Sequence, residues 1–355
     1  MEADKNSIIG KYLSNKEIIK VKNKIQSQEM FENGKILLET DKIHTVKPLK
    51  VEIPKGRLTV ITGVSGSGKT TMVLESLVPA LEAITSNKKL PEHILNIEAE
   101  GIKQVKLIDA TPIGINVRST VATYANIHDE LRKTFAKISK AEGFEYKAGD
   151  FSYNTGKLRC STCDGTGVIN LDVQFLPDVE IPCPECGGAR YAKIAEKIKY
   201  NGYSLPEIME MNVTKALEVC QKIKLVHQRL EILQELGLGY LTLGEATPSL
   251  SGGEAQRLKL ASEMRKIQTD SVFVFDEPTI GLHPKDVETL LKVFATLIEN
   301  GATVIVIEHD LDVIRNADYI IDMGPEGGEA GGEIIFAGTL KELKKCKISK
   351  TAKFI

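Results

Sequence analysis

The feature that most restricts the fold of this chain is a glycine-rich segment at residues 63–70, which directly follows an apolar run at residues 58–61. The segment fits the pattern G-x-x-x-x-G-K-[ST]. This pattern works between a strand and a helix, because its backbone N–H groups must converge at the turn that joins them. Residues 70–77 suit such a helix, which argues against the alternative of a chance glycine turn.

The residue types in this segment predict a site for a chain of phosphate groups. Glycines let the backbone curl around phosphate oxygens, Lys69 can reach the outer phosphates, and the Thr70 hydroxyl can bind Mg²⁺. The candidate nucleotide-binding residues here are Gly63, Ser65, Gly66, Ser67, Gly68, Lys69, Thr70 and Thr71.

Short apolar runs elsewhere predict a parallel sheet and an α/β fold. They occupy residues 272–275, 304–307 and 319–321, and a further β-rich run, which contains Lys106, occupies residues 105–108. Short strands that are apolar throughout are typical of parallel sheets, which are buried on both faces. Apolar residues at helical spacing predict a helix over 286–299.

Two acidic residues follow the apolar run at 272–275. Asp276, at the predicted strand end, is placed to bind Mg²⁺, and Glu277 is placed to polarise an attacking water molecule. An acidic pair alone is common in surface turns, so this interpretation depends on the glycine-rich segment.

Residues 250–254 read Leu-Ser-Gly-Gly-Glu. Ser251 and Glu254 form a capping box that opens a helix over 255–266. A helix N-terminus with two glycines and a serine also suits an anion, which makes Ser251, Gly252 and Gly253 candidate phosphate ligands. Both interpretations can hold, because capping fixes the loop that would bind the phosphate.

Four of the six cysteines form two C-x₂-C pairs with nineteen residues between them. This spacing predicts a closed, structural Zn²⁺ site made by Cys160, Cys163, Cys183 and Cys186. Matched pairs disfavour the alternatives of a redox pair or free thiols, while Cys220 and Cys346 have no such partners. Alternating apolar residues over 169–175 and 179–181 predict a β-ribbon that carries the pairs.

Charge and hydropathy restrict the partners of the chain. With 46 Lys and Arg against 48 Asp and Glu, the net charge of −2 excludes a globally basic nucleic-acid binder. No apolar run is long enough to span a bilayer and the first residues lack a signal sequence, so we expect a cytoplasmic protein without membrane insertion.

A local basic patch flanks the cysteine pairs. Residues 131–160 carry a net charge of +4, and further basic residues follow the second pair. These side chains either bind the phosphates of double-stranded DNA or form a solvated surface. The candidate DNA contacts are Lys157, Arg159, Arg190 and Lys193.

The nucleotide motifs resemble those of the ABC-type ATPases. Residues 250–254 match the signature motif of that family, and Asp276 with Glu277 match its Walker B pair. His309, which follows the predicted strand at 304–307, matches its switch histidine, and the resemblance implies contact with the γ-phosphate. In this family the signature of one unit closes on the phosphate loop of another, so the resemblance also implies a partner unit.

With its cysteine pairs, the chain resembles the carboxy-terminal half of the UvrA family, the damage-recognition ATPases of bacterial nucleotide excision repair. The resemblance rests on residues 9–14, 151–154, 175–179, 186–191, 236–240, 281–283 and 322–328. It implies ATP, Mg²⁺ and Zn²⁺ as cofactors, ATP hydrolysis and binding to double-stranded DNA. The first half of the family is missing, which implies a homodimer or a separately encoded first half. The family's domain for a UvrB-type partner belongs to that missing half.

One departure from the family concerns catalysis. The family has glutamine where this chain has Ala110, and alanine can contact neither Mg²⁺ nor water, so we expect slow turnover. A UvrA-like regulator without catalysis and an antibiotic self-resistance ATPase therefore stay open. The ATPase subunit of an exporter would share the nucleotide motifs but has no use for a four-cysteine module.

These observations predict the organisation of the chain. We expect a linker or lead-in over 1–45, an ATP-binding core over 46–114 and 247–340, and a C-terminal tail over 341–355. An inserted signature region over 115–246 would contain the zinc module at 150–200.

Overall fold

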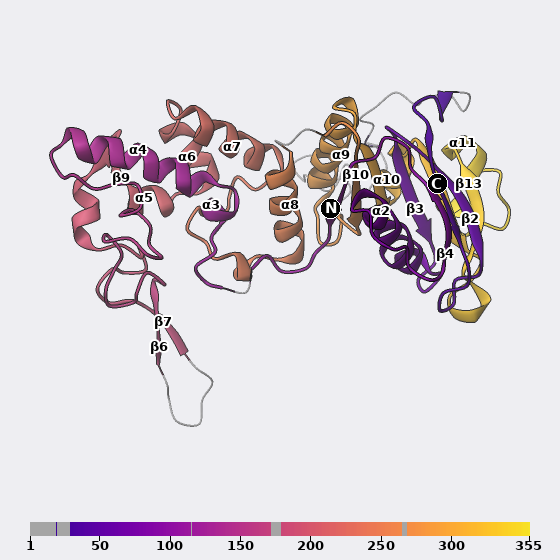
Figure 1. The fold of residues 1–355 in the computed structure, drawn as a ribbon, viewed down its shortest axis with the longest axis horizontal. Coiled ribbons are helices and arrows are strands. Elements are labelled where there is room, and N and C mark those ends of the chain that lie inside the picture. Colours follow the sequence, from indigo (N-terminus) through magenta and orange to yellow (C-terminus); the bar gives the residue numbers. More distant parts are fainter. Residues whose placement is uncertain (1–18, 20–28, 115, 172–178, 265–267) are drawn as a thin grey trace, which may run out of the picture. The chain divides into compact units, whose positions relative to one another are not determined.

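The computed structural model describes residues 19, 29–114, 116–171, 179–264 and 268–355. The chain divides into two compact units: unit 1 contains residues 1–110 and 266–355, and unit 2 contains residues 111–265. Unit 1 is an α/β structure and unit 2 is mainly helical (Figure 1). Within the described ranges, no helix combines the length and the apolar character needed to cross a membrane.

A six-stranded sheet forms the centre of unit 1, in the order β13-β12-β3-β11-β10-β5. Its neighbouring strands pair in parallel except for β13, which is antiparallel to β12. The predicted α/β class and the five predicted strands are confirmed, whereas β13 was not foreseen. The strands are β3 (Leu58–Gly63), β5 (Gln104–Ile108), β10 (Ser271–Asp276), β11 (Thr303–Ile307), β12 (Tyr319–Gly324) and β13 (Glu333–Gly338).

A second, antiparallel sheet of unit 1 has the order β2-β1-β4. It consists of β1 (Lys35–Thr40), β2 (Leu49–Pro54) and β4 (Ile94–Glu98). Strand β1 corrects the expectation of a lead-in over 1–45, because Ile36 and Leu38 are fully buried in the core of the unit. Residues 1–18 and 20–28 of the expected lead-in lie outside the described residues.

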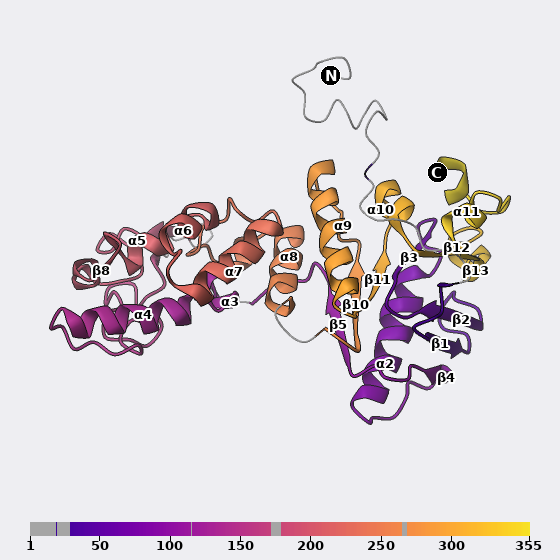
Figure 2. The ribbon, with the colours of Figure 1, turned by 90° about the horizontal axis from the view of Figure 1, so that it is seen from above.

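The helices of unit 1 are α2 (Val78–Thr85), α9 (Pro284–Glu299), α10 (Leu311–Asn316) and α11 (Leu340–Leu343). The helix predicted after the glycine-rich segment is present, with residues 71–77 in π-helical turns that continue into α2. Figure 2 shows α2 and α9 beside the large sheet.

Alternating side chains of β10 pack into different layers of unit 1. Val272 and Val274 join the core formed with β1 and the helical segment that follows the glycine loop. Phe275 points to the opposite face, where its ring lies 4.7 Å from that of Phe294 in α9. Strand β10 is therefore buried on both faces, as its short apolar run predicts.

The segment expected as a C-terminal tail is folded against unit 1. The Ser349 hydroxyl donates a hydrogen bond of 2.5 Å to the carboxylate of Asp322, a buried residue of β12. Lys350 forms an ion pair of 2.6 Å with Glu326. These contacts make residues 349–350 part of the folded unit.

Unit 2 contains six α-helices, two 3-10 helices and two short ribbons among its described residues; Figure 1 shows their arrangement. The β-ribbon predicted near the cysteine pairs is confirmed as the antiparallel pair β6–β7, and the part of the prediction at 172–178 lies outside the described residues. The elements are α3 (Val121–Tyr124), α4 (Ile127–Ala141), β6 (Val168–Leu171), β7 (Val179–Pro182), β8 (Lys199–Tyr200), β9 (Tyr203–Ser204), α5 (Leu205–Met209), α6 (Val213–Val219), α7 (Lys224–Glu235) and α8 (Gly252–Glu263).

Helix α8 lies in unit 2, whereas the sequence analysis assigned residues 247–340 to the core. The reason is its packing, because α8 contacts α3 and α7 of the same unit. The structure therefore divides the chain near residue 265. The helix ends at Glu263, before the expected residue 266, and residues 265–267 lie outside the described chain.

A buried polar network joins α4 to the chain on both sides of the cysteine pairs. The Tyr191 hydroxyl donates to the Phe151 carbonyl at 3.0 Å, so it accepts from the Nε2–H of His128 at 2.7 Å. Burial lowers the pKa of His128 to about 3, and the positive charge of Arg132 acts in the same direction. The imidazole is therefore neutral in the folded state.

We expect His128 to make the stability of unit 2 dependent on pH. Its pKa is lower in the folded state than in the unfolded state, so stability is retained above the unfolded pKa and is lost as the pH falls from about 6.5 towards 3, by at most about 1.4 kcal/mol per pH unit. His128→Gln keeps an N–H donor near the Nε2 position but does not titrate.

Urea denaturation at several pH values, followed by a signal from unit 2, measures this effect. The difference in unfolding free energy between the wild type and His128→Gln should shrink as the pH falls. A difference that stays constant from pH 7 to pH 5 would contradict the prediction.

Candidate nucleotide site and metal centre

The parallel register of unit 1 brings the predicted nucleotide-site residues of that unit to one edge of the sheet. Ile307, at the end of β11, pairs with Asp276 of β10 on one side and with Ile61 of β3 on the other. The loops that leave the carboxyl ends of these strands therefore begin side by side. They carry the glycine loop, the Asp276–Glu277 pair and His309.

The glycine loop has a backbone conformation that other residues cannot easily adopt. Gly63 has φ +134°, and a Cβ atom there would lie 2.0 Å from the Met323 carbonyl oxygen of β12. Gly68 has φ +95°, and its Cβ would lie 2.4 Å from a methyl group of Val46. The positive φ angles and the close approach of neighbouring atoms together explain why these two positions require glycine.

Lys69 is buried beneath the glycine loop. Its Nζ donates to the carbonyl oxygens of Gly63 at 3.2 Å and Val64 at 2.9 Å. Burial lowers the pKa of Lys69, and the negative charges of Glu277 and Asp322 oppose that shift. The ammonium group thus lies within its own loop, and these bonds use two of its three donors.

The acidic pair and His309 lie together. The distance from His309 Nε2 to Glu277 Oε1 is 3.6 Å, and both side chains are partly exposed. Burial and the charges of Glu277 and Asp109 raise the pKa of Asp276. Burial and the charge of Lys69 lower the pKa of His309. The arrangement suits a hydrated cation and a polarised water molecule.

A second glycine-rich loop, which the sequence analysis did not assign to the site, contacts the first. The Gly328 N–H donates to the Gly66 carbonyl at 3.0 Å. A Cβ atom on Gly327 would lie 2.5 Å from the Ser65 carbonyl oxygen. The run of glycines at 327–328 was visible in the sequence, but nothing there indicated which loop it approaches.

Glu308 is a further residue of this site that was not predicted from the sequence. Its carboxylate is buried and accepts hydrogen bonds from the Thr279 hydroxyl at 2.6 Å and from the His309 N–H at 2.7 Å. An acidic residue directly before the candidate histidine was the only available signal.

The predicted capping box of the signature loop (residues 250–254) is confirmed in unit 2. Glu254 Oε2 accepts from the Ser251 N–H at 2.7 Å and from its hydroxyl at 2.8 Å. The Tyr240 hydroxyl donates to the other carboxylate oxygen at 2.5 Å. Ser251 and Gly252 are exposed at the start of α8, so backbone N–H groups are accessible to an anion.

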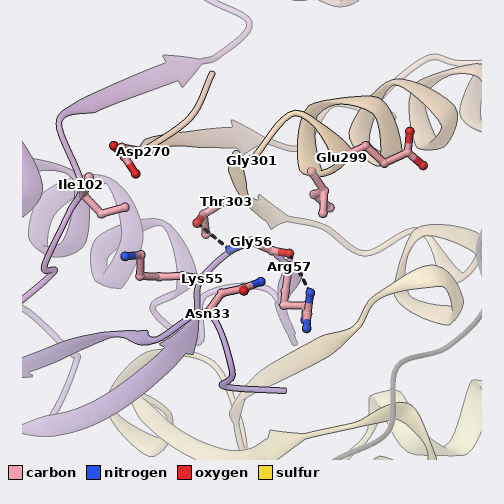
Figure 3. Close-up of a pocket in the computed structure, with 10 residues that line it drawn as sticks. Asn33, Lys55, Gly56, Arg57, Ile102, Asp270, Glu299, Gly301 and Thr303 are labelled. Carbon is pink, nitrogen blue, oxygen red and sulfur yellow. Dashed lines mark hydrogen bonds between the residues drawn. The ribbon is translucent and has the colours of Figure 1, made fainter. Parts of the chain in front are cut away.

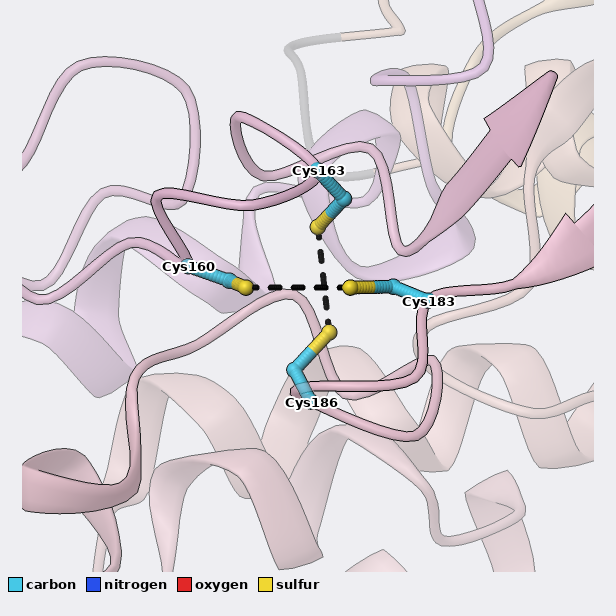
Figure 4. A group of neighbouring side chains, drawn as sticks. All are labelled: Cys160, Cys163, Cys183 and Cys186. Atoms are coloured by element: carbon cyan, nitrogen blue, oxygen red, sulfur yellow. Dashed lines mark hydrogen bonds between the residues drawn. The ribbon is translucent and has the colours of Figure 1, made fainter.

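The four paired cysteines converge in unit 2 (Figure 4). Their Sγ atoms all lie within 4.8 Å of one another, with 3.9 Å between Cys160 and Cys183 and 3.7 Å between Cys163 and Cys186. A tetrahedral ion with metal–sulfur bonds of about 2.3 Å places its ligands roughly 3.8 Å apart. The cluster therefore fits one tetrahedral metal ion, while Cys220 and Cys346 lie outside it.

Two of the four candidate DNA-binding residues are engaged in the fold of unit 2. Arg190 is buried, donates to the Val117 carbonyl at 3.0 Å, and lies 5.3 Å from the ring centre of Tyr153. Arg159 forms an ion pair of 3.0 Å with Asp164. By contrast, Lys157 and Lys193 are exposed, and the ion pair of Lys193 with Glu185 is long, at 3.7 Å.

A cavity of about 430 Å³ lies at the opposite edge of the large sheet (Figure 3). Its lining includes Thr303 at the start of β11 and Gly56 just before β3, so it is at the amino ends of the strands. Charges of both signs line it, among them Arg57 and Asp270. The cavity is thus separate from the edge that carries the glycine loop.

Similar proteins are found in both sequence and structure comparisons, although no family model matches the chain. UvrABC system protein A of Staphylococcus aureus (strain COL) is 42% identical over 99% of this chain, and that of Staphylococcus epidermidis is 43% identical over 99%. The crystal structure of UvrA2 from Deinococcus radiodurans covers 98% of the chain at 36% identity, with a TM-score of 0.89. The chain spans 37% of these two relatives and 42% of the UvrA2 chain.

We expect the cysteine cluster to bind one metal ion per chain and Cys183→Ser to lose it, because a closed site needs all four thiolates. Metal analysis of protein purified without chelators measures this. The variant should also loosen residues around the cluster while the fold of unit 1 is retained. Cys346→Ser, outside the cluster, is the control and should keep its metal. Metal-free wild-type protein would refute the assignment.

Proposed function

Since this chain belongs to the UvrA family of ABC-type ATPases, we propose that it binds and hydrolyses ATP with Mg²⁺ and that it binds double-stranded DNA. The proposed setting is nucleotide excision repair or a related DNA-damage response. The observation that carries the proposal is the convergence of the glycine loop, Asp276, Glu277 and His309 at one edge of the sheet.

The glycine loop would hold the phosphates of ATP. The candidate residues from Gly63 to Thr71 supply backbone N–H groups, and Lys69, which donates to two carbonyls of the loop, has a further N–H for a phosphate oxygen. Thr70 and Asp276 would hold Mg²⁺, which when bound offsets the negative charge of the phosphate oxygens.

Glu277 and His309 would act on the cleavage step. The Glu277 carboxylate can accept a proton from the attacking water, which increases the nucleophilicity of its oxygen. His309, 3.6 Å from that carboxylate, can donate to the γ-phosphate or orient Glu277. Ala110 supplies no side chain that can contact water or Mg²⁺, so we propose slow turnover. A regulator that binds ATP without cleaving it is the alternative that this residue favours.

The signature loop would act on a second nucleotide-binding unit. Ser251, Gly252 and Gly253 offer an exposed helix N-terminus that suits the γ-phosphate bound to another unit. We therefore propose a homodimer with two composite sites, or pairing with a separate UvrA-like first half. A twofold dimer is the simpler arrangement, because the same two surfaces then meet twice.

Zinc is the metal proposed for the cysteine cluster, because four thiolates in a closed tetrahedron suit Zn²⁺. Such a module has a structural role and would present basic side chains to DNA. Lys157 and Lys193 are the better candidates for phosphate contacts, since Arg159 and Arg190 are engaged in the fold. Contacts to the backbone tolerate any base sequence, as a damage sensor requires.

We expect Glu277→Gln to retain ATP and to accumulate as a dimer, because binding is intact while cleavage stalls. Sedimentation at micromolar concentration, with and without ATP and Mg²⁺, measures this. Adding Lys69→Ala to the same protein should abolish the nucleotide-dependent dimer. If Glu277→Gln stays monomeric although it binds ATP, self-pairing is wrong and a separate partner unit is required.

We expect Lys157→Ala combined with Lys193→Ala to weaken duplex DNA binding and to reduce its salt dependence. Loss of two phosphate contacts should lower the slope of log K against log salt by about 1.8. Titration of a labelled duplex at several salt concentrations measures the slope, and Lys106→Ala in unit 1 is the control. An unchanged slope would place the DNA surface elsewhere.

A further inference from the structure

The carboxylate of Glu308 connects two loops of the nucleotide site. One oxygen, Oε1, accepts from the Thr279 N–H at 2.8 Å and from the Thr279 hydroxyl at 2.6 Å. The other, Oε2, accepts from the N–H groups of His309 at 2.7 Å and Asp310 at 3.0 Å. The first loop follows β10 and the second follows β11, so this one side chain bridges neighbouring strands.

The backbone around Glu308 extends this connection to the other strands. The Glu308 N–H donates to the Ile61 carbonyl of β3, and the Glu277 N–H donates to the Ile307 carbonyl of β11, each at 3.0 Å. Glu277 has a left-handed backbone with φ +45°, which a glutamate adopts only when its surroundings hold it there. Thr279 follows it by two residues, so fixing Thr279 restricts the turn that carries Glu277.

The burial of Glu308 shows why all four bonds matter. The residue is 2% exposed, and a buried carboxylate is costly unless donors surround it. Both oxygens accept and neither donates, which only a carboxylate can do. Glutamine has the same size, but its NH₂ group would face N–H donors on one side. Glu308→Gln therefore removes one half of the bridge without removing the side chain.

We propose that Glu308 is a positioning residue that holds His309 and Glu277 in the geometry needed for ATP cleavage, an inference that rests on the proposed ATPase function. Glu308 contacts neither nucleotide nor water in this role. It acts through the backbone of both loops, so that His309 and Glu277 stay 3.6 Å apart while the phosphates are bound elsewhere, by the glycine loop. The role predicts a loss of cleavage rate without a loss of ATP binding.

Steady-state kinetics of ATP hydrolysis and direct ATP binding test this role. Glu308→Gln should lower kcat by about tenfold to a hundredfold, since small misplacements of reacting groups cost that much, while KM and ATP affinity stay unchanged. Thr279→Val should lower kcat in the same way. Thr279→Ser keeps the hydroxyl, so it should retain the kcat of the wild type. Glu100→Gln, an exposed residue of unit 1, is the control and should behave as wild type.

Amide hydrogen exchange without nucleotide provides a readout that does not depend on activity. Peptides containing Thr279, His309 and Asp310 should exchange faster in Glu308→Gln, while peptides from the glycine loop should not. Unchanged exchange, an unchanged kcat, or equal losses of binding and rate would overturn the proposal. If Glu308→Gln does not fold, the kcat, ATP affinity and hydrogen exchange of Thr279→Val test the proposal in its place. Wild-type protein that fails to bind ATP would instead refute the proposed function. The exchange result would still show whether Glu308 holds the two loops in place.

Discussion

The parallel register of β3, β11, β10 and β5 is the constraint on which the candidate nucleotide site depends. Because β10 is buried on both faces, a shift of one residue would turn Phe275 away from Phe294 and into the layer occupied by Val274. Such a shift would also move Asp276 out of line with Ile307. Packing of apolar side chains thus determines where the polar groups at the strand ends lie.

The cysteine cluster gives unit 2 a different kind of constraint. Among the residues that the structure describes, Ile169 is the apolar neighbour that the cysteines have in this small core, so the apolar surface seen to be buried here provides little stabilisation. Bonds to a metal ion would supply the stabilisation that apolar burial does not, as in other small modules. The buried contacts of Tyr191 and Arg190 then fix the orientation of the module on the helical part of its unit.

The sequence predicted the elements that have a strong local signal. The apolar strands, the ribbon, the capping box at Ser251 and the convergence of four cysteines all follow from patterns within a few residues. What it missed depends on tertiary structure. Strand β1 has a run of only three apolar residues, without alternation. Helix α8 joins unit 2 through packing on α3 and α7, which no local pattern indicates. Arg190 looked like a surface cation, but its partner Val117 is distant in sequence. The role of Glu308 depends on its hydrogen bond with Thr279, which lies in the loop after a different strand.

The order of the strands also has a consequence for how the chain folds as it is synthesised. Both neighbours of β3 in the sheet, β11 and β12, lie beyond residue 300. Strand β5 can pair only after β10 has been synthesised, and β10 follows the whole of unit 2. Unit 2 can therefore fold while β3 and β5 still have open edges, a state that favours association with other chains. The phosphate-binding loop is among the first parts of its site to leave the ribosome, yet it is among the last to acquire its neighbours.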